Sequence, residues 1–279
     1  MSRKISVGFV VYNPEGSFTL RLQQLIALGF DVYVFDNSPW KSEVRNLSLT
    51  NHNIKYFTVG KNVGLGYGLS SVCSQAYYTG YSTLLFFDQD TIFSYETLDF
   101  IENYHLNNKS IEDEFSAIAF SSKGGEEGSN LDCFREVSMI INSGSLFFLR
   151  NLKNLGWHNV NYFVDCVDYE FCLKSKIAGL KIGEWIRTPG FDHTSEQADK
   201  KYQVFGKQYL FRIYSSTRIK DTLKSSIKLI ASAFLSGQFN YAVKLIRHLL
   251  IYSVVQVVIR FMLPRQSEVR SINERRFRK

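Results

Sequence analysis

Two carboxylates, Asp88 and Asp90, stand one residue apart directly after the apolar run 84–87. An unbroken apolar run of this length is typical of a strand that is buried on both faces. In an open α/β sheet, ligands bind outside the carboxyl ends of the strands, where such a pair of acids would lie. Oxygen ligands of this kind suit Mg²⁺ or Mn²⁺, which bind carboxylates together with substrate phosphates. For the tripeptide alone, a solvated polar turn is the commoner explanation, so the other motifs must decide.

A second group of acids, Asp165, Asp168 and Glu170, surrounds the start of a helix predicted over residues 167–178. Asp168 and Glu170 in a first turn could simply complement the helix dipole. However, Asp165 and Asp168 stand among Phe, Val and Cys residues, which indicates partial burial. Burial raises the pKa of a carboxyl group and suits it to act as a general base, so this group favours function over a structural role.

Polar residues also follow the other predicted strands. Strands are predicted over 5–11, 32–35, 54–58 and 84–87, and the polar residues after them are Asn13, Asp36, Asn62 and Asp88. An acid at such a strand end can accept a hydrogen bond from a base or ribose, although an Asx-turn explains Asp36 alone as well. The run 62–68 resembles a glycine-rich phosphate loop without the P-loop lysine, and close helix packing would explain its glycines equally well.

Helical patterns alternate with these strands. Phe18, Leu22 and Leu25 repeat at helical spacing before Gly29, and a second apolar face covers residues 65–77. The alternation predicts an α/β fold with a doubly wound, mostly parallel sheet flanked by helices. Because the carboxyl ends of parallel strands meet at one edge, the polar residues that follow them should line one cleft.

The later part of the chain has a looser pattern. The predictions are a helix over 96–104, a strand over 117–120, a mobile loop over 121–130, a strand pair over 137–150 broken at 142–145, and helix from Gln203 almost to the end. We therefore predict a catalytic domain over residues 1–220 and a basic helical region over 221–279.

The C-terminal region is basic and apolar at once. Between residues 200 and 279, only Asp221, Glu268 and Glu274 are acidic, which indicates an anionic partner such as membrane lipid, nucleic acid or an anionic carrier. Basic residues that interrupt an apolar helical face suit a membrane interface. A helical cap or a homodimer interface explains the same pattern equally well.

The totals describe a globular protein of 279 residues with a formal charge of +7 and an aromatic share of 15%. The four cysteines show neither CxxC pairing nor metal-site spacing, which favours a reduced, cytoplasmic chain. We expect no signal peptide, and because no run of 18 apolar residues occurs we expect no membrane-spanning helix.

In chain order, these motifs resemble those of family 2 inverting glycosyltransferases of the GT-A fold, and within them the bacterial rhamnosyltransferase-like group. The matching blocks are Val10-Val11-Tyr12-Asn13-Pro14, Phe35-Asp36-Asn37-Ser38, Asn62-Val63-Gly64, Phe87-Asp88-Gln89-Asp90-Thr91, Asn142-Ser143-Gly144-Ser145 and Phe163-Val164-Asp165-Cys166-Val167-Asp168-Tyr169-Glu170, with His193, Tyr214 and Arg218 in later motifs. The resemblance covers about residues 5–218. It departs from the group's pattern at Lys174, where Arg is usual, and at Ile219, where Asn is usual.

The resemblance implies a role for each matching residue. Asp168 would be the catalytic base, and Asp90, Asp88 and His193 would hold Mg²⁺ or Mn²⁺. The nucleotide and donor would be bound by Tyr12, Asn13, Asp36, Asn62, Gly64, Asp88, Gln89 and Arg218. Ser143, Gly144, Asp165 and Glu170 would lie on the acceptor side.

The resemblance also implies a substrate pair and a location. The favoured donor is dTDP-L-rhamnose, and the acceptor a lipid-linked or polysaccharide glycan of the bacterial surface, such as O-antigen, capsule or cell wall. The enzyme would be cytoplasmic, peripheral on the inner face of the plasma membrane, and without a nucleic-acid partner.

Three alternatives remain open. The donor could be another UDP or dTDP sugar, such as galactose, glucose, N-acetylglucosamine or galactofuranose. A nucleotidyltransferase would need a basic loop after the first strand, which residues 12–16 do not provide. A non-catalytic nucleotide- or sugar-binding protein would have no use for acidic clusters along one cleft edge.

Overall fold

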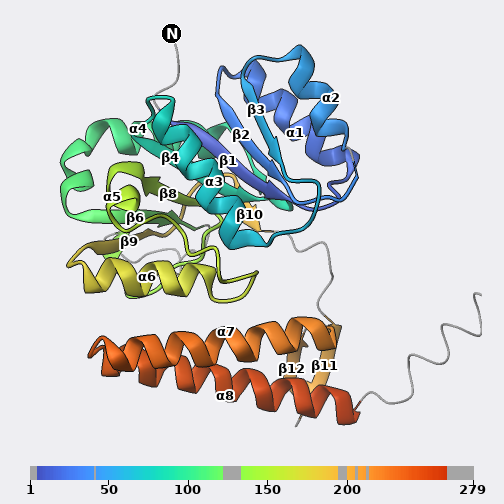
Figure 1. Cartoon of the computed structure of the whole chain (residues 1–279), viewed down its shortest axis with the longest axis vertical. Helices are drawn as coiled ribbons and strands as arrows, with labels where there is room; N and C mark the ends of the chain where they lie inside the picture. The colour runs from blue at the N-terminus through green and yellow to red at the C-terminus, as the bar shows by residue number, and fades with distance from the viewer. Residues whose placement is uncertain are drawn as a thin grey trace, which may run out of the picture. The chain divides into compact units, whose positions relative to one another are not determined.

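The computed structural model of the chain describes residues 5–40, 42–121, 133–193, 200–204, 207–211 and 214–262. The chain forms two compact units, Met1–Thr194 and Ser195–Lys279. The first unit is built on an eight-stranded sheet with helices packed against it, and the second contains a strand hairpin and two long helices (Figure 1).

The sheet of the first unit is mixed, with the strand order β3-β2-β1-β4-β8-β6-β9-β7. Its strands are β1 (Ser6–Val11), β2 (Val32–Asp36), β3 (Ile54–Thr58), β4 (Thr83–Asp88), β6 (Phe115–Phe120), β7 (Phe134–Glu136), β8 (Ser145–Phe148) and β9 (Lys181–Trp185). β1 to β4 run parallel, and Val10 is in register with Phe35 on one side and Asp88 on the other. β8 runs antiparallel to β4. The predicted α/β class is confirmed, and the carboxyl ends of β1 to β4 meet at one edge.

Helices cover both faces of this sheet. They are α1 (Gly16–Ala27), α2 (Glu43–Thr50), α3 (Leu65–Tyr78), α4 (Tyr95–Asn107), α5 (Leu149–Asn154) and α6 (Val167–Ile177), with a short 3₁₀ helix over Lys109–Asp113. Alternate residues of β1 point to opposite faces, as in any strand. The Phe9 ring packs edge-on against Phe18 of α1, with ring centroids 5.0 Å apart. On the other face, Val10 lies against Gly68 of α3, where an added Cβ would be 2.7 Å from the valine side chain.

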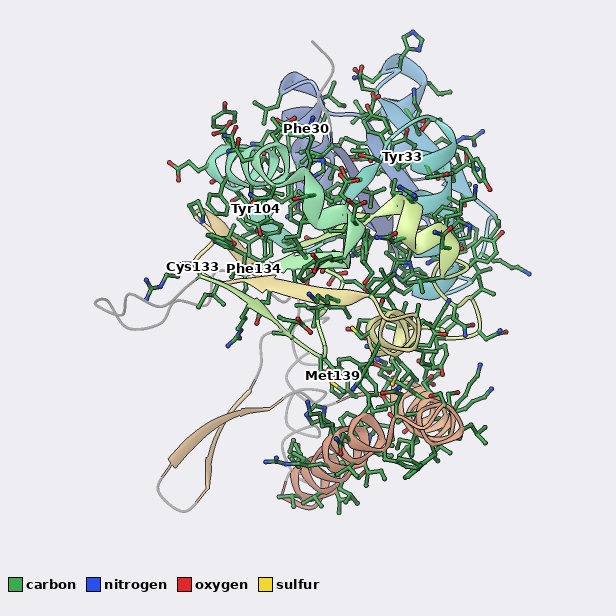
Figure 2. The ribbon with its side chains drawn as sticks, turned by 90° about the vertical axis from the view of Figure 1, so that its left-hand side faces the viewer. Phe30, Tyr33, Tyr104, Cys133, Phe134 and Met139 are labelled. Carbon is green, nitrogen blue, oxygen red and sulfur yellow. The ribbon has the colours of Figure 1, made fainter. Side chains whose placement is uncertain are left out.

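Much of the high aromatic content is used in packing (Figure 2). Phe30 and Tyr33 are buried. On the side of the sheet formed by β9 and β7, the rings of Tyr104 and Phe134 lie 6.3 Å apart, and both contact Trp185. These rings pack around β9 and β7, the last two strands in the order of the sheet.

Two sequence predictions are wrong. Residues 137–150 do not form a strand pair, because Gly144, with φ of +77°, turns the chain into the single strand β8, after which α5 begins at Leu149. The chain from Gln203 is not helical throughout, since β11 (Lys200–Val204) pairs antiparallel with β12 (Lys207–Phe211). The predicted loop over 121–130 lies almost wholly outside the described residues.

The second unit contains a helical hairpin, made of α7 (Ser216–Leu235) and α8 (Phe239–Met262) (Figure 1). The Ser215 hydroxyl caps α7 by accepting the Arg218 N–H, and Gly237, with φ of +72°, lies in the turn between the helices. Within the described residues, the 22-residue stretch Phe239–Arg260 is long and apolar enough to cross a membrane by length and composition alone. We expected no membrane-spanning helix from the sequence because only unbroken apolar runs were considered, and basic residues interrupt this stretch.

Candidate active site

Asp88 is the last residue of β4, and Gln89 and Asp90 form the turn after it; all three residues are partly buried. The Asp88 N–H donates to the Ser143 hydroxyl at 3.0 Å, and that hydroxyl also bonds the Thr91 hydroxyl at 2.7 Å. Ser143 itself is buried, so the structure places it beneath the turn, where it fixes the backbone between the two acids and β5 (Thr91–Phe93).

The Gln89 side chain ties this turn to the loop after β1. Its carbonyl oxygen accepts the Tyr12 N–H at 2.7 Å, and its amide donates to the Tyr12 carbonyl at 3.3 Å. The Arg21 guanidinium donates to the Gln89 backbone carbonyl. Sequence reasoning missed Arg21, although its position three residues after Phe18 puts it on the inner face of α1, where an arginine needs an acceptor.

The strand β10 (Phe191–His193) pairs antiparallel with β5 and sets His193 opposite Thr91, the residue after Asp90. The predicted metal-binding residues therefore come from adjoining backbone positions, although the His193 side chain lies outside the described part of the structure. Among described residues, no group of three or more His, Cys, Asp or Glu side chains could hold a metal ion. Two carboxylates still fit Mg²⁺ or Mn²⁺, because Mg²⁺ keeps several waters and takes further ligands from substrate phosphates.

Asp36, at the end of β2, is fully buried and holds the segment that follows it. One carboxylate oxygen accepts the Ser38 N–H at 2.8 Å, and the other accepts the hydroxyls of Ser42 at 2.5 Å and Tyr56 at 2.9 Å. The neighbouring Asn37 accepts the Val63 N–H at 3.0 Å, which links this segment to the loop before α3. A contact of Asp36 with a nucleotide stays a prediction, because here its carboxylate supports the loop.

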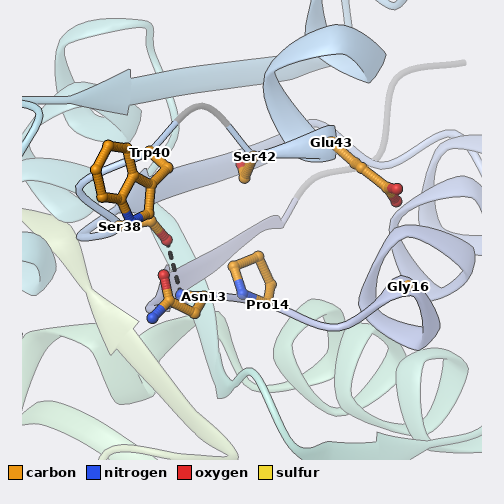
Figure 3. Close-up of a pocket in the computed structure, with 7 residues that line it drawn as sticks. All are labelled: Asn13, Pro14, Gly16, Ser38, Trp40, Ser42 and Glu43. Carbon is orange, nitrogen blue, oxygen red and sulfur yellow. Dashed lines mark hydrogen bonds between the residues drawn. The ribbon is translucent and has the colours of Figure 1, made fainter.

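A hollow of about 290 Å³ lies between the loops that follow β1 and β2 (Figure 3). It is lined by Asn13, Pro14, Gly16, Ser38, Trp40, Ser42 and Glu43. The Asn13 N–H donates to the Ser38 hydroxyl at 2.7 Å, and Asn13 has φ of +47°, a conformation that asparagine tolerates well. The Trp40 side chain is 79% exposed. The hollow thus offers an aromatic ring and a carboxylate beside the predicted nucleotide edge.

The glycine-rich loop before α3 is packed under the segment 159–163. The Asn62 side chain accepts the Gly64 N–H at 3.0 Å, and the Leu65 N–H donates to the Phe163 carbonyl at 2.5 Å. Gly64 has φ of +90°, and a Cβ there would lie 2.5 Å from the same carbonyl oxygen. Close packing, the alternative explanation of these glycines, is therefore what the structure shows.

Replacing Gly66 with alanine should destabilise the protein by about 1–3 kcal/mol, the usual cost of overpacking. The new Cβ would lie 2.5 Å from the Asn159 carbonyl and 2.6 Å from the Tyr162 carbonyl, and backbone cannot move aside cheaply. Gly16→Ala is the matched control, because nothing lies within 4 Å of a Cβ there. Urea unfolding should separate the two variants, and equal free energies of unfolding would contradict the packing.

Asp168 lies in the first turn of α6, two residues after Cys166, the N-cap residue, whose φ is +66°. Burial raises the pKa of Asp168 from an ordinary 3.8 to about 7, and the negative charges of Asp88 and Asp165 add to the rise. Hydrogen bonds from the Tyr169 and Asp168 backbone N–H groups oppose it. A helix N-terminus contributes about 0.3–1 kcal/mol, less than one pKa unit, so desolvation outweighs the dipole.

The structure brings three of the predicted acids together, whereas a fourth, Glu170, makes a structural hydrogen bond. Asp168, Asp165 and Asp88 are close enough for their charges to interact. Glu170 is buried and accepts the Asn159 amide at 2.9 Å, so it braces the loop before α6. Arg218 belongs to the second unit, where its guanidinium carbon lies 5.8 Å from the centre of the Tyr214 ring.

No model of a known protein family matches the chain, and no curated protein matches it in sequence. Solved structures do match it. Residues 1–349 of S. aureus TarS in complex with UDP superpose with a TM-score of 0.52 at 16% identity, covering 82% of this chain and 64% of that one. GalNAc-T7 with UDP, GalNAc and Mn²⁺ gives a TM-score of 0.52 at 13% identity, covering 80% of this chain and 47% of that one. The chain has the GT-A fold.

The GT-A match is a match to part of each larger protein. A longer S. aureus TarS structure gives a TM-score of 0.50 at 18% identity, with 69% of this chain and 37% of that one covered. The chain therefore spans between 37% and 64% of the length of these structures. At identities of 13% to 18%, the likeness to these structures shows the fold alone.

Proposed function

We propose that the protein is an inverting glycosyltransferase that moves a sugar from a nucleoside diphosphate donor to an acceptor hydroxyl. The observation that carries the proposal is the partly buried Asp168, whose pKa of about 7 suits a general base, placed at the same edge as Asp88. The GT-A fold supports it, because the matching structures of TarS and GalNAc-T7 contain UDP.

In the proposed reaction, the Asp168 carboxylate takes the proton from the acceptor hydroxyl. The acceptor oxygen forms a bond to the anomeric carbon from the face opposite the diphosphate. The bond between that carbon and the phosphate oxygen breaks, and its electron pair leaves with the nucleoside diphosphate. A single in-line displacement of this kind inverts the configuration at the anomeric carbon.

Asp90, Asp88 and His193 would hold Mg²⁺ or Mn²⁺; the backbone of His193 pairs with Thr91, the residue after Asp90. When bound, the ion would neutralise the negative charge that develops on the leaving diphosphate. The Gln89 side chain keeps these two acids at a constant distance from the loop after β1, since it bonds both backbone groups of Tyr12.

For the donor we propose dTDP-L-rhamnose, on the basis of the Asp88-Gln89-Asp90 motif and the 164–170 motif together. The acceptor would be a lipid-linked or polysaccharide glycan of the bacterial surface. A UDP sugar is the second candidate, because both TarS and GalNAc-T7 are found with UDP.

Incubation of the purified protein with each donor, an acceptor extract and Mn²⁺ should release nucleoside diphosphate from dTDP-L-rhamnose faster than from UDP sugars. The product should carry the inverted anomeric configuration by NMR. Faster release from a UDP sugar would reject the rhamnose donor and keep the transferase. Release from no donor, in a protein that still binds UDP or dTDP, would favour the non-catalytic alternative.

A further inference from the structure

The helical hairpin α7–α8 exposes two apolar stripes. On α8, the residues Phe239, Val243, Leu250, Val254 and Val257 lie on one side of the helix, and Leu250 and Val254 are 61% and 60% exposed. On α7, Leu223, Ile227 and Phe234 form a similar row, with Ile227 61% exposed. The inner sides of the two helices are occupied by other residues, such as Leu229, Ala233 and Leu245, which are buried. The stripes are therefore additional to what the hairpin needs for its own packing.

Exposed basic residues border both stripes. Lys220, Lys224 and Lys228 recur every fourth residue along α7, so they form a row beside its apolar stripe. Lys244 and Arg247 lie exposed along α8. Residues 195–279 contain 17 Lys and Arg against five Asp and Glu, whereas residues 1–194 contain 16 against 21. The positive charge of the chain therefore belongs to the unit that carries the apolar stripes.

We propose that the exposed apolar stripes of the α7–α8 hairpin, with the basic residues beside them, dock on an anionic lipid leaflet. An apolar stripe bordered by lysines is the pattern of helices that lie in a membrane interface, where the apolar side enters the acyl boundary and the lysines meet the headgroups.

Charge favours lipid over a second copy of the hairpin. Two copies packed through these faces would bring two lysine rows together, which opposes association, whereas an anionic leaflet attracts them. Charge also favours lying on the membrane over crossing it. A spanning α8 would carry Lys244 and Arg247 into the hydrocarbon, where charged side chains are strongly disfavoured.

Flotation of the full-length protein with vesicles tests the docking without reference to catalysis. The protein should float with vesicles of phosphatidylglycerol and phosphatidylcholine, should stay behind with phosphatidylcholine alone, and should be released by high salt or alkaline carbonate. Failure to float with anionic vesicles would overturn the proposal, and resistance to carbonate would replace it with a spanning helix.

Paired variants test separately how the lysines and the apolar stripes contribute to vesicle binding. The double variant K220E and K224E should bind anionic vesicles at least about 25-fold more weakly, because each lysine near an anionic surface contributes about fivefold. The control K109E and K176E makes the same charge change at exposed sites of the first unit and should bind normally. L250S with V254S should lose at least about 10-fold, whereas L20S with L49S, exposed on α1 and α2, should lose nothing.

Light scattering tests the remaining alternative, in which a second copy of the chain covers this face. If the stripe variants bound vesicles normally but changed a dimer into a monomer, the face would be a contact between copies, and the lipid proposal would be wrong.

Discussion

Asp168→Asn should abolish sugar transfer while the protein still binds nucleoside diphosphate. The amide cannot take the proton from the acceptor hydroxyl, and loss of a positioned base typically costs about 10²–10⁴-fold in rate. The amide keeps the size of the side chain, so binding of UDP or dTDP with Mn²⁺ should be unchanged by calorimetry. Asp113→Asn, at an exposed carboxylate, is the control and should keep full activity. Full transfer by Asp168→Asn would remove this residue from the role of base.

The pH dependence gives the same assignment a second test. With a pKa of about 7, Asp168 is ionised and able to accept a proton only above that value. The rate should therefore fall about tenfold per pH unit below about 7 and level off above it. A profile that continued level down to about pH 5 would show that the base has an ordinary carboxyl pKa and is another group.

The same raised pKa has a consequence for stability. Because the folded carboxyl binds its proton more tightly than the unfolded one, the native state holds more protons between about 3.8 and about 7. The contribution of this group to stability is therefore lost as the pH rises through that window. Asp168→Asn removes the effect, so the variant should unfold at higher urea than the wild type at pH 8 and gain less at pH 4. Stability is thus reduced at the residue that we propose as the catalytic base.

The fold could be predicted where the pattern was local. The strands β1, β2 and β4 are short apolar runs, and α1 and α3 have regular apolar spacing between glycines, so the parallel half of the sheet follows from the sequence. The elements β5 and β10 have three residues each and too little pattern to recognise. The hairpin β11–β12 is not evident from the sequence, because the residues between its strands, Phe205-Gly206, are not one of the Asn-Gly, Asp-Gly or Gly-Gly pairs that mark hairpin turns.

The acidic residues of the candidate site could be predicted from the sequence, but the residues that hold them by hydrogen bonds could not. Asp88 and Asp168 are candidates on sequence grounds because carboxylates next to buried residues are unusual. Arg21 was missed because its acceptor, the Gln89 carbonyl, is 68 positions away in the chain. For the same reason Tyr56 gave no sign that it would donate to Asp36, 20 positions away. Hydrogen bonds across strands depend on register, which no local pattern contains.

Asp90→Asn should make nucleotide binding independent of the metal. If Asp90 holds the ion that contacts the diphosphate, its neutral amide should weaken Mn²⁺-dependent binding of UDP or dTDP by at least about 10–100-fold, the loss that even outer-sphere partners of a metal cause. Binding without metal should be unchanged, because the hydrogen bonds of Gln89 to Tyr12 at the predicted nucleotide edge do not involve the Asp90 carboxylate. Calorimetry with Mn²⁺ and with EDTA measures both values, and Asp113→Asn is again the control.

The two carboxylates of the turn should differ in this experiment. The backbone of Asp88 is fixed by Ser143 beneath the turn, and its charge interacts with Asp168. Asp88→Asn should therefore weaken metal-dependent binding and also lower the pKa that governs the rate, because a negative charge beside the base is removed. If Asp90 acts only on the metal ion, Asp90→Asn should leave the pH profile of the residual activity in place. If both substitutions displaced the pH profile of the rate equally, Asp88 and Asp90 would act as one cluster. The proposed division, in which Asp90 holds the metal and Asp88 also raises the pKa of the base, would then be wrong.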